Sequence, residues 1–238
     1  MANFIKLGSL YFDDQPQEVG AKYKEGRITV GETTPGKEIR WGKVGGLLVA
    51  DRCICVNVSW DKLDEQGLVF GTAVYINRRY YACRCLKTDV GAYTDRPNEW
   101  DATLNALGEG NEKWHWHKMF FWGQEISRYT KDNRVVRGYH TARHQTSIKP
   151  SHRNNLLGFR PALEYLGAEP ADAESLLGRQ VKVYGPNDEF VNGRLLSVDN
   201  YDLVLEGASL MTKPCKWAVL AGEKTIIDRS DVSWLKEG

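Results

Sequence analysis

The sequence of 238 residues predicts an α+β fold in two parts, an irregular mixed domain followed by a small β-barrel. Three observations lead to this prediction. Period-two alternation with two short capped helices marks the first hundred residues, and a run of short strands follows Gly178. A Gly-, Pro- and Ala-containing stretch lies between them. The expected boundaries are 1–166 for the first domain, 167–177 for a linker with a short helix, and 178–238 for the barrel.

β-Branched and aromatic residues alternate along three early segments of the chain, separated by Gly-containing breaks. These segments are Ile28 to Val30, Ile54 to Trp60 and Ala73 to Leu86. Such alternation is typical of strands with one buried face. We therefore expect the first domain to be built around these strands.

Two helices interrupt the strand pattern, and each begins at a capping residue. Ser59 precedes a helix that stops at Gly67, and Asn98 precedes one that stops at Gly108. Ser and Asn cap helix N-termini by accepting from free backbone N–H groups, and Asp101 stands at capping-box distance from Asn98.

No period persists from Asn111 to Arg160, which predicts an ordered loop held by side chains. Leu166 to Gly178 predicts a short helical turn that acts as a linker. After Gly178, short alternating runs with a Pro-Asn-Asp turn at 186–188 predict strands that close as a five-stranded barrel.

Charge is unevenly distributed along the chain. Residues 111–160 hold ten Lys and Arg against three Asp and Glu, so 10 − 3 gives +7, and all five His lie in this window. The whole chain carries +1, so the remainder carries −6. A local basic block indicates an anionic partner. The alternative is that these arginines pair with carboxylates elsewhere in the fold.

Trp114 to Trp122 places five aromatic rings and two imidazoles beside Lys113 and Lys118. Rings hold planar or apolar ligand faces and cations hold phosphates, whereas some of these rings could instead fill the core. If this segment is extended, Trp114, Trp116 and Lys118 share one face. The ligand-binding residues that we predict are Trp114, His115, Trp116, Lys118, Trp122, Tyr139, Arg143, His144 and Arg153.

Five cysteines without framework spacing favour a reducing compartment over a secreted disulfide scaffold. Cys53-Ile54-Cys55 and Cys83-Arg84-Cys85 are either buried thiols or a zinc site, and buried thiols are the expectation. No uncharged apolar stretch is long enough to span a bilayer. We therefore expect a cytoplasmic protein without a membrane segment, metal or cofactor.

The segment RVVRG, followed by TARH and NNLLGFRPALE, resembles the C-terminal signature of the formylglycine-generating enzymes, the sulfatase-modifying-factor family. Arg137-Gly138 and Gly158-Phe159-Arg160 match, whereas Tyr139-His140-Thr141 stand where the family has Gly-Ser-Trp. The resemblance covers about residues 40 to 166 and implies a C-type-lectin-like fold. It also implies structural roles for Arg137 and Arg160. The family's copper-binding cysteine pair is missing, because no Cys lies between Cys85 and Cys215, so its oxidase chemistry is not expected.

Residues 176–236 resemble Sm-like proteins of the bacterial Hfq type. Gly193, Leu195, Asp199, Tyr201 and Val204-Leu205 follow the first Sm motif. Gly193 suits a sharply bent strand, and Asp199 suits a turn that bonds its own backbone. The resemblance implies a base-stacking role for Tyr201, but Asp228 and Arg229 lie near the positions of the family's Lys-His pair. Residues 173–238 carry eight Lys and Arg against ten Asp and Glu, so 8 − 10 gives −2.

The functional expectation is a non-catalytic binding protein that captures an anionic ligand, either a nucleotide, a nucleic acid strand or an acidic metabolite. The barrel would promote homo-oligomer formation and so provide avidity. Two alternatives stay open. One is a protein–protein interaction module of phage or mobile-element origin, and the other is an RNA-binding Sm-like protein.

Overall fold

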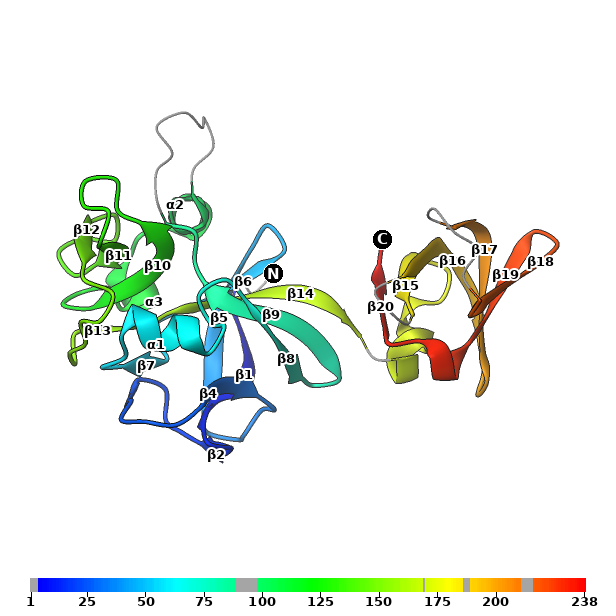
Figure 1. The fold of residues 1–238 in the computed structure, drawn as a ribbon, viewed down its shortest axis with the longest axis horizontal. Coiled ribbons are helices and arrows are strands. Elements are labelled where there is room, and N and C mark those ends of the chain that lie inside the picture. The colour runs from blue at the N-terminus through cyan, green and yellow to red at the C-terminus, as the bar shows by residue number, and fades with distance from the viewer. Residues whose placement is uncertain (1–3, 89–97, 169, 186–188, 211–215) are drawn as a thin grey trace. The chain divides into compact units, whose positions relative to one another are not determined.

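The structure, a computed structural model, describes residues 4–88, 98–168, 170–185, 189–210 and 216–238. The chain divides into two compact units (Figure 1). The first unit contains Met1–Asn77 and Tyr81–Tyr165, and the second contains Arg78–Tyr80 and Leu166–Gly238. Most described elements are strands, so the predicted α+β class is wrong and the protein is mostly β. Among the described residues, no helix is long and apolar enough to cross a membrane.

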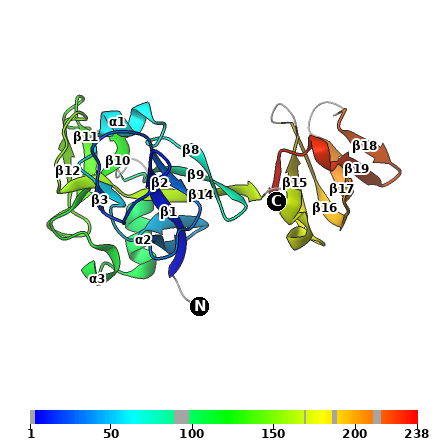
Figure 2. The ribbon, with the colours of Figure 1, turned by 90° about the horizontal axis from the view of Figure 1, so that it is seen from below.

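The first unit contains two sheets (Figure 2). In one sheet the order runs β2-β1-β5-β6-β14, with β4 beside β1 and the β8–β9 hairpin beside β14. The pairings among β1, β2, β4, β5, β6 and β14 are antiparallel, which is typical of hairpin-connected strands. Its strands are β1 (Phe4–Phe12), β2 (Gln15–Pro16), β4 (Ile28–Gly31), β5 (Glu38–Val44), β6 (Leu47–Ala50), β8 (Thr72–Ile76), β9 (Arg79–Cys85) and β14 (Pro161–Ala168).

The other sheet has the order β12-β11-β10-β13-β7-β3. The β10–β13 and β3–β7 pairs are parallel, and the remaining pairs are antiparallel. Its strands are β3 (Ala21–Lys22), β7 (Cys55–Val56), β10 (Phe120–Ile126), β11 (Arg134–Gly138), β12 (Gln145–Ile148) and β13 (Leu157–Phe159).

Most of this second sheet comes from 111–160, where we expected an ordered loop. That prediction is wrong because β10, β11 and β13 contain runs of consecutive buried residues. In β11, all four residues from Val135 to Gly138 are buried, so no alternation is visible in the sequence. This segment accounts for much of the error in fold class.

Both predicted helices are confirmed. The first, α1 (Trp60–Glu65), begins at Ser59, whose hydroxyl accepts from the backbone N–H of Lys62. The second, α2 (Glu99–Leu107), begins at Asn98, whose side chain accepts from the backbone N–H of Asp101. A third short helix, α3 (Asn111–Trp114), precedes a loop and is followed by β10.

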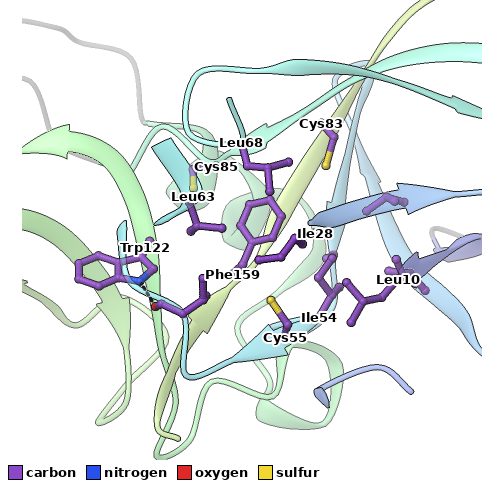
Figure 3. Close-up of a cluster of buried hydrophobic side chains, with 14 of the residues drawn as sticks. Leu10, Ile28, Ile54, Cys55, Leu63, Leu68, Cys83, Cys85, Trp122 and Phe159 are labelled. Carbon is purple, nitrogen blue, oxygen red and sulfur yellow. Dashed lines mark hydrogen bonds between the residues drawn. The ribbon is translucent and has the colours of Figure 1, made fainter. Parts of the chain in front are cut away.

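The core of the first unit consists of buried side chains from both of its sheets and from α1 (Figure 3). Phe159 of β13 packs there with Leu63 of α1 and Leu68, while Leu10 and Ile28 enter from the first sheet. All of these side chains have less than 3% of their surface exposed. Burying this many apolar side chains is the main force that holds the unit together.

The second unit is an antiparallel sheet with the order β18-β19-β17-β16-β15-β20, and it wraps around its own core. The predicted strands after Gly178 are present, but the described pairings leave the sheet open rather than closing a five-stranded barrel. The Pro-Asn-Asp turn lies outside the described residues. The elements are η1 (Pro170–Leu176), β15 (Gln180–Tyr184), β16 (Phe190–Val198), β17 (Asp202–Leu210), β18 (Ala218–Ala221), β19 (Lys224–Asp228), η3 (Arg229–Asp231) and β20 (Trp234–Glu237).

Two local predictions in the second unit are confirmed. The register between β16 and β17 shifts around Gly193, which marks a bulge where this strand bends. The Asp199 carboxylate accepts from the backbone N–H groups of Tyr201 and Asp202, each at 2.7 Å, which closes the turn between the two strands.

Candidate functional site

Two of the tryptophans predicted to bind ligand lie in the core of the first unit. Trp114 and Trp122 have no exposed surface, and Trp122 donates its indole N–H to the carbonyl of Val58 at 2.9 Å (Figure 3). Trp114 belongs to a helix and not to an extended segment, so the expected shared face with Trp116 and Lys118 is not formed. Neither buried ring is available at a surface.

Arginines of the basic block are largely compensated within the fold. Arg137 donates to Asp101 at 2.5 Å, and Arg143 donates to Glu109 at 2.7 Å. The guanidinium of Arg134 lies over the Trp60 ring, 4.2 Å from its centroid. These arginines therefore interact with other residues of the fold, which was the alternative to binding an anionic partner.

Trp116, Lys118, Tyr139 and His144 are brought together around one loop. The backbone N–H of Lys118 donates to the carbonyl of Tyr139, and that of Tyr139 donates to the carbonyl of Trp116. The Tyr139 ring stacks on Phe120 with centroids 4.7 Å apart. Lys118 and Tyr139 both have left-handed backbone conformations, with φ of 55° and 77°, which are strained for residues other than glycine.

His115 faces inward rather than toward this loop's surface. Its Nε2 lies 3.0 Å from the guanidinium of Arg52, and its Nδ1 lies 3.9 Å from the buried carboxylate of Asp51. Partial burial and the positive charge of Arg52 lower the pKa of His115. His115 therefore belongs to a network with Arg52 and Asp51.

Arg160 and Arg137 have structural roles, as the sequence predicted. Arg160 is fully buried, donates to the carbonyl of Trp114 at 2.5 Å, and packs over the Trp100 and Phe121 rings. Burial lowers the pKa of its guanidinium to about 10.

Four thiols lie in the core of the first unit, from Cys53, Cys55, Cys83 and Cys85. Burial raises the pKa of Cys53 to about 11 and that of Cys83 to about 12. Among the described residues, no group of three or more His, Cys, Asp or Glu side chains could hold a metal ion. Thiols that stay protonated are poor nucleophiles, and these four side chains pack as part of the hydrophobic core.

A surface that we did not predict lies on the outer side of three strands in the second unit. Register places Phe190, Tyr184 and Trp234 in one row across β16, β15 and β20. The next row contains Asn192, Lys182 and Lys236, and Gln180 lies opposite Arg194 beyond it. We call these eight residues the lysine–aromatic face: Gln180, Lys182, Tyr184, Phe190, Asn192, Arg194, Trp234 and Lys236.

Alternation explains why these side chains point outward. Val181, Val183, Val191 and Leu235 are the intervening residues, and each is buried in the core of the second unit. Neighbouring residues of a strand point to opposite faces of the sheet. The lysine–aromatic face is correspondingly half-buried or exposed.

The rings of this face form a continuous row. Tyr184 and Trp234 stack with centroids 3.8 Å apart and planes inclined by 9°, and Phe190 lies 5.4 Å from Tyr184. A Cβ atom added to Gly167 would lie 2.2 Å from the Trp234 ring, so the glycine lets its backbone pack against that ring. Cross-strand stacking and the close Gly167 backbone therefore hold Trp234 in this row.

Cations border the rings. The Nζ of Lys182 lies 4.4 Å from the Phe190 ring centroid, and that of Lys236 lies 6.0 Å and 5.9 Å from the centroids of Tyr184 and Trp234. None of the eight residues is a carboxylate, although residues 173–238 carry a net charge of −2. The sequence conceals this face because its members lie far apart along the chain and meet only through strand register.

No protein-family model matches the chain, and no curated protein matches it. Part of the chain is similar to a solved structure described as a novel Sm-like archaeal protein from Pyrobaculum aerophilum, with 28% identity and a TM-score of 0.23. The match covers 29% of this chain and 49% of the archaeal protein, which is about half of that protein's length. These comparisons give no support to the resemblance to formylglycine-generating enzymes.

Proposed function

We propose that this protein is a non-catalytic binding protein for single-stranded nucleic acid, which lies across the lysine–aromatic face. The observation that carries the proposal is the row of three rings bordered by Lys182 and Lys236. Bases pack on aromatic side chains with little regard to sequence, and cations in a neighbouring row pair with the phosphates of the same strand.

The arrangement of the two lysines supports this proposal. Lys182 and Lys236 lie directly opposite each other on neighbouring strands, where like charges destabilise a sheet. Nearby rings offset part of this repulsion by cation–π contact. A polyanion bound along the face would remove the rest, because its phosphates would lie between the two ammonium groups.

The chemistry of the face favours a single strand over a duplex. A duplex hides its bases, whereas a single strand can place them on apolar ring surface. The amides of Gln180 and Asn192 can donate to and accept from base edges. Because those amides are few, we expect tolerance of base sequence.

Salt-dependent binding of a fluorescently labelled single strand, measured by anisotropy with RNA and DNA homopolymers, tests the proposal. Two phosphate contacts, from Lys182 and Lys236, predict a slope of log affinity against log salt of about −1.4 for a single strand. Lys236→Gln should reduce the magnitude of that slope by about 0.7, and Trp234→Ala should weaken binding at every salt concentration.

Lys224→Gln is the matched control, because Lys224 is an exposed lysine of the same sheet that lies opposite Glu206 on β17. It should bind as the unmodified protein does. Wild-type affinity in both Lys236→Gln and Trp234→Ala would overturn the proposal, as would the absence of any saturable binding.

A homo-oligomer is the second part of the proposal. Several copies of the lysine–aromatic face in one assembly would bind one strand together, and the effective concentration of the second face would then raise the affinity for long strands. The affinity should keep rising as the nucleic acid strand becomes longer than one lysine–aromatic face can bind. This result would support the homo-oligomer.

A further inference from the structure

A second basic surface, in the first unit, consists of two adjoining hollows that share Ser151 and Arg153. The smaller hollow, of about 290 Å³, lies between the turn from Tyr23 to Gly26 and the start of α1. The larger, of about 560 Å³, follows the chain from Ile148 to Arg153 after β12. Arg153 therefore lines both hollows.

Charge in these hollows is strongly one-sided. Their lining residues include the cations Lys24, Lys62, Lys149 and Arg153 against the single carboxylate of Glu25, so 4 − 1 gives +3. Lys62 is paired with Glu65. Within the part of the chain that the structure describes, Lys24, Lys149 and Arg153 have no ion pair or side-chain hydrogen bond. This contrasts with Arg137 and Arg143, which the fold compensates.

The backbone around the hollows is well anchored. Asn57 donates its backbone N–H to the carbonyl of Asn154 at 3.0 Å, and Asp61 donates to that of Pro150 at 3.2 Å. On the opposite wall, the Tyr23 hydroxyl donates to the carbonyl of Gly26 at 2.8 Å and so closes its own turn. The uncompensated cations therefore project from fixed backbone on two sides.

We infer that these two hollows bind a phosphate group, with Arg153 as the central ligand. A guanidinium donates two parallel hydrogen bonds to phosphate oxygens, and the ammonium groups of Lys24 and Lys149 add point charges. The hydroxyl of Ser151, which lines both hollows, supplies a further donor. The second hollow leaves space for the group that carries the phosphate.

This inference is independent of strand binding by the second unit. The phosphate could come from a small phosphate ester or from a nucleic acid backbone, since both present the same oxygens. Inorganic phosphate is therefore the first probe, and a single-stranded homopolymer is the second.

Titration of the full chain with inorganic phosphate at constant ionic strength, followed by amide chemical shifts in NMR, tests the site. Saturable shifts confined to the Lys149–Asn154 loop and the Tyr23–Gly26 turn are expected. Arg153→Ala should weaken phosphate binding at least tenfold, as loss of a charged hydrogen-bond donor predicts, and Arg153→Lys should weaken it less.

Arg79→Ala is the matched control, because Arg79 is an exposed arginine of β9 that lines neither hollow. Shifts that are equal in Arg153→Ala and the unmodified protein would overturn the inference, as would shifts that do not saturate. If the homopolymer shifts the same amides and Arg153→Ala abolishes these shifts, the phosphate comes from the backbone of a strand. If the homopolymer does not shift these amides, the phosphate comes from a small ester.

The phosphate titration does not depend on the lysine–aromatic face, so failure of strand binding in the second unit would not change its outcome.

Discussion

Arg137 and Arg143 belong to the same basic segment, yet the fold gives them opposite environments. Arg137 has 2% of its side chain exposed and donates to Asp101 and to the carbonyl of Thr88, whereas Arg143 has 39% exposed. Residue type and local spacing could not show which of the two arginines is buried. Only the match of Arg137-Gly138 to a signature indicated which arginine is structural, because pairing with Asp101 depends on a contact distant in sequence.

Arg137→Ala should lower the free energy of unfolding by about 3 kcal/mol, because it leaves the partly buried carboxylate of Asp101 without its main partner. Arg143→Ala should lower it by less than about 1 kcal/mol, since exposed ion pairs contribute little. Urea unfolding monitored by tryptophan fluorescence measures both values. Equal losses in the two variants would contradict the assigned roles.

At the scale of elements, capped helices and alternating strands were predictable and strands with runs of consecutive buried residues were not. Ser59 and Asn98 mark helix starts because their side chains bond the first turn, which is a local interaction. β11 carries Arg137 and Gly138 in buried positions, so its sequence lacks the expected alternation. The lysine–aromatic face was missed for a related reason, because cross-strand register is not a local property.

The strand β9 allows a test by pH. Burial raises the pKa of the Cys83 thiol from 9.0 to about 12. The unfolded chain therefore ionises this thiol at lower pH than the folded chain, so stability present below about pH 9 is lost as pH rises toward 12. The loss approaches about 1.4 kcal/mol per pH unit within that window.

Comparison of the unmodified protein with Cys83→Ala, by urea unfolding at several pH values above 9, isolates this contribution. The variant should be less stable at pH 8, because a buried side chain is shortened, but its stability should fall less steeply as pH rises. Parallel pH profiles would show that Cys83 is accessible to solvent in the folded protein.

At the scale of the whole molecule, we expect one edge of the second unit to mediate association between copies of the chain. In the described strand order β18 lies at the end of the sheet, and Val219 and Leu220 have 61% and 64% of their surface exposed. An apolar edge strand with free backbone groups tends to pair with another chain. Val219→Lys should therefore shift sedimentation toward smaller species, whereas Lys216→Ala, on exposed chain just before β18, should not. Identical sedimentation of all three proteins would exclude this edge as the contact.

The second unit also includes Arg78–Tyr80, from the tip of the β8–β9 hairpin. Arg78 lies 3.3 Å from Asp172 of η1, a residue distant in the chain. A fragment that begins at Leu166 would lack these three residues and leave Asp172 without that partner. The second unit is thus discontinuous in sequence, so insertion or deletion in an early hairpin can alter it while every residue after Tyr165 stays the same.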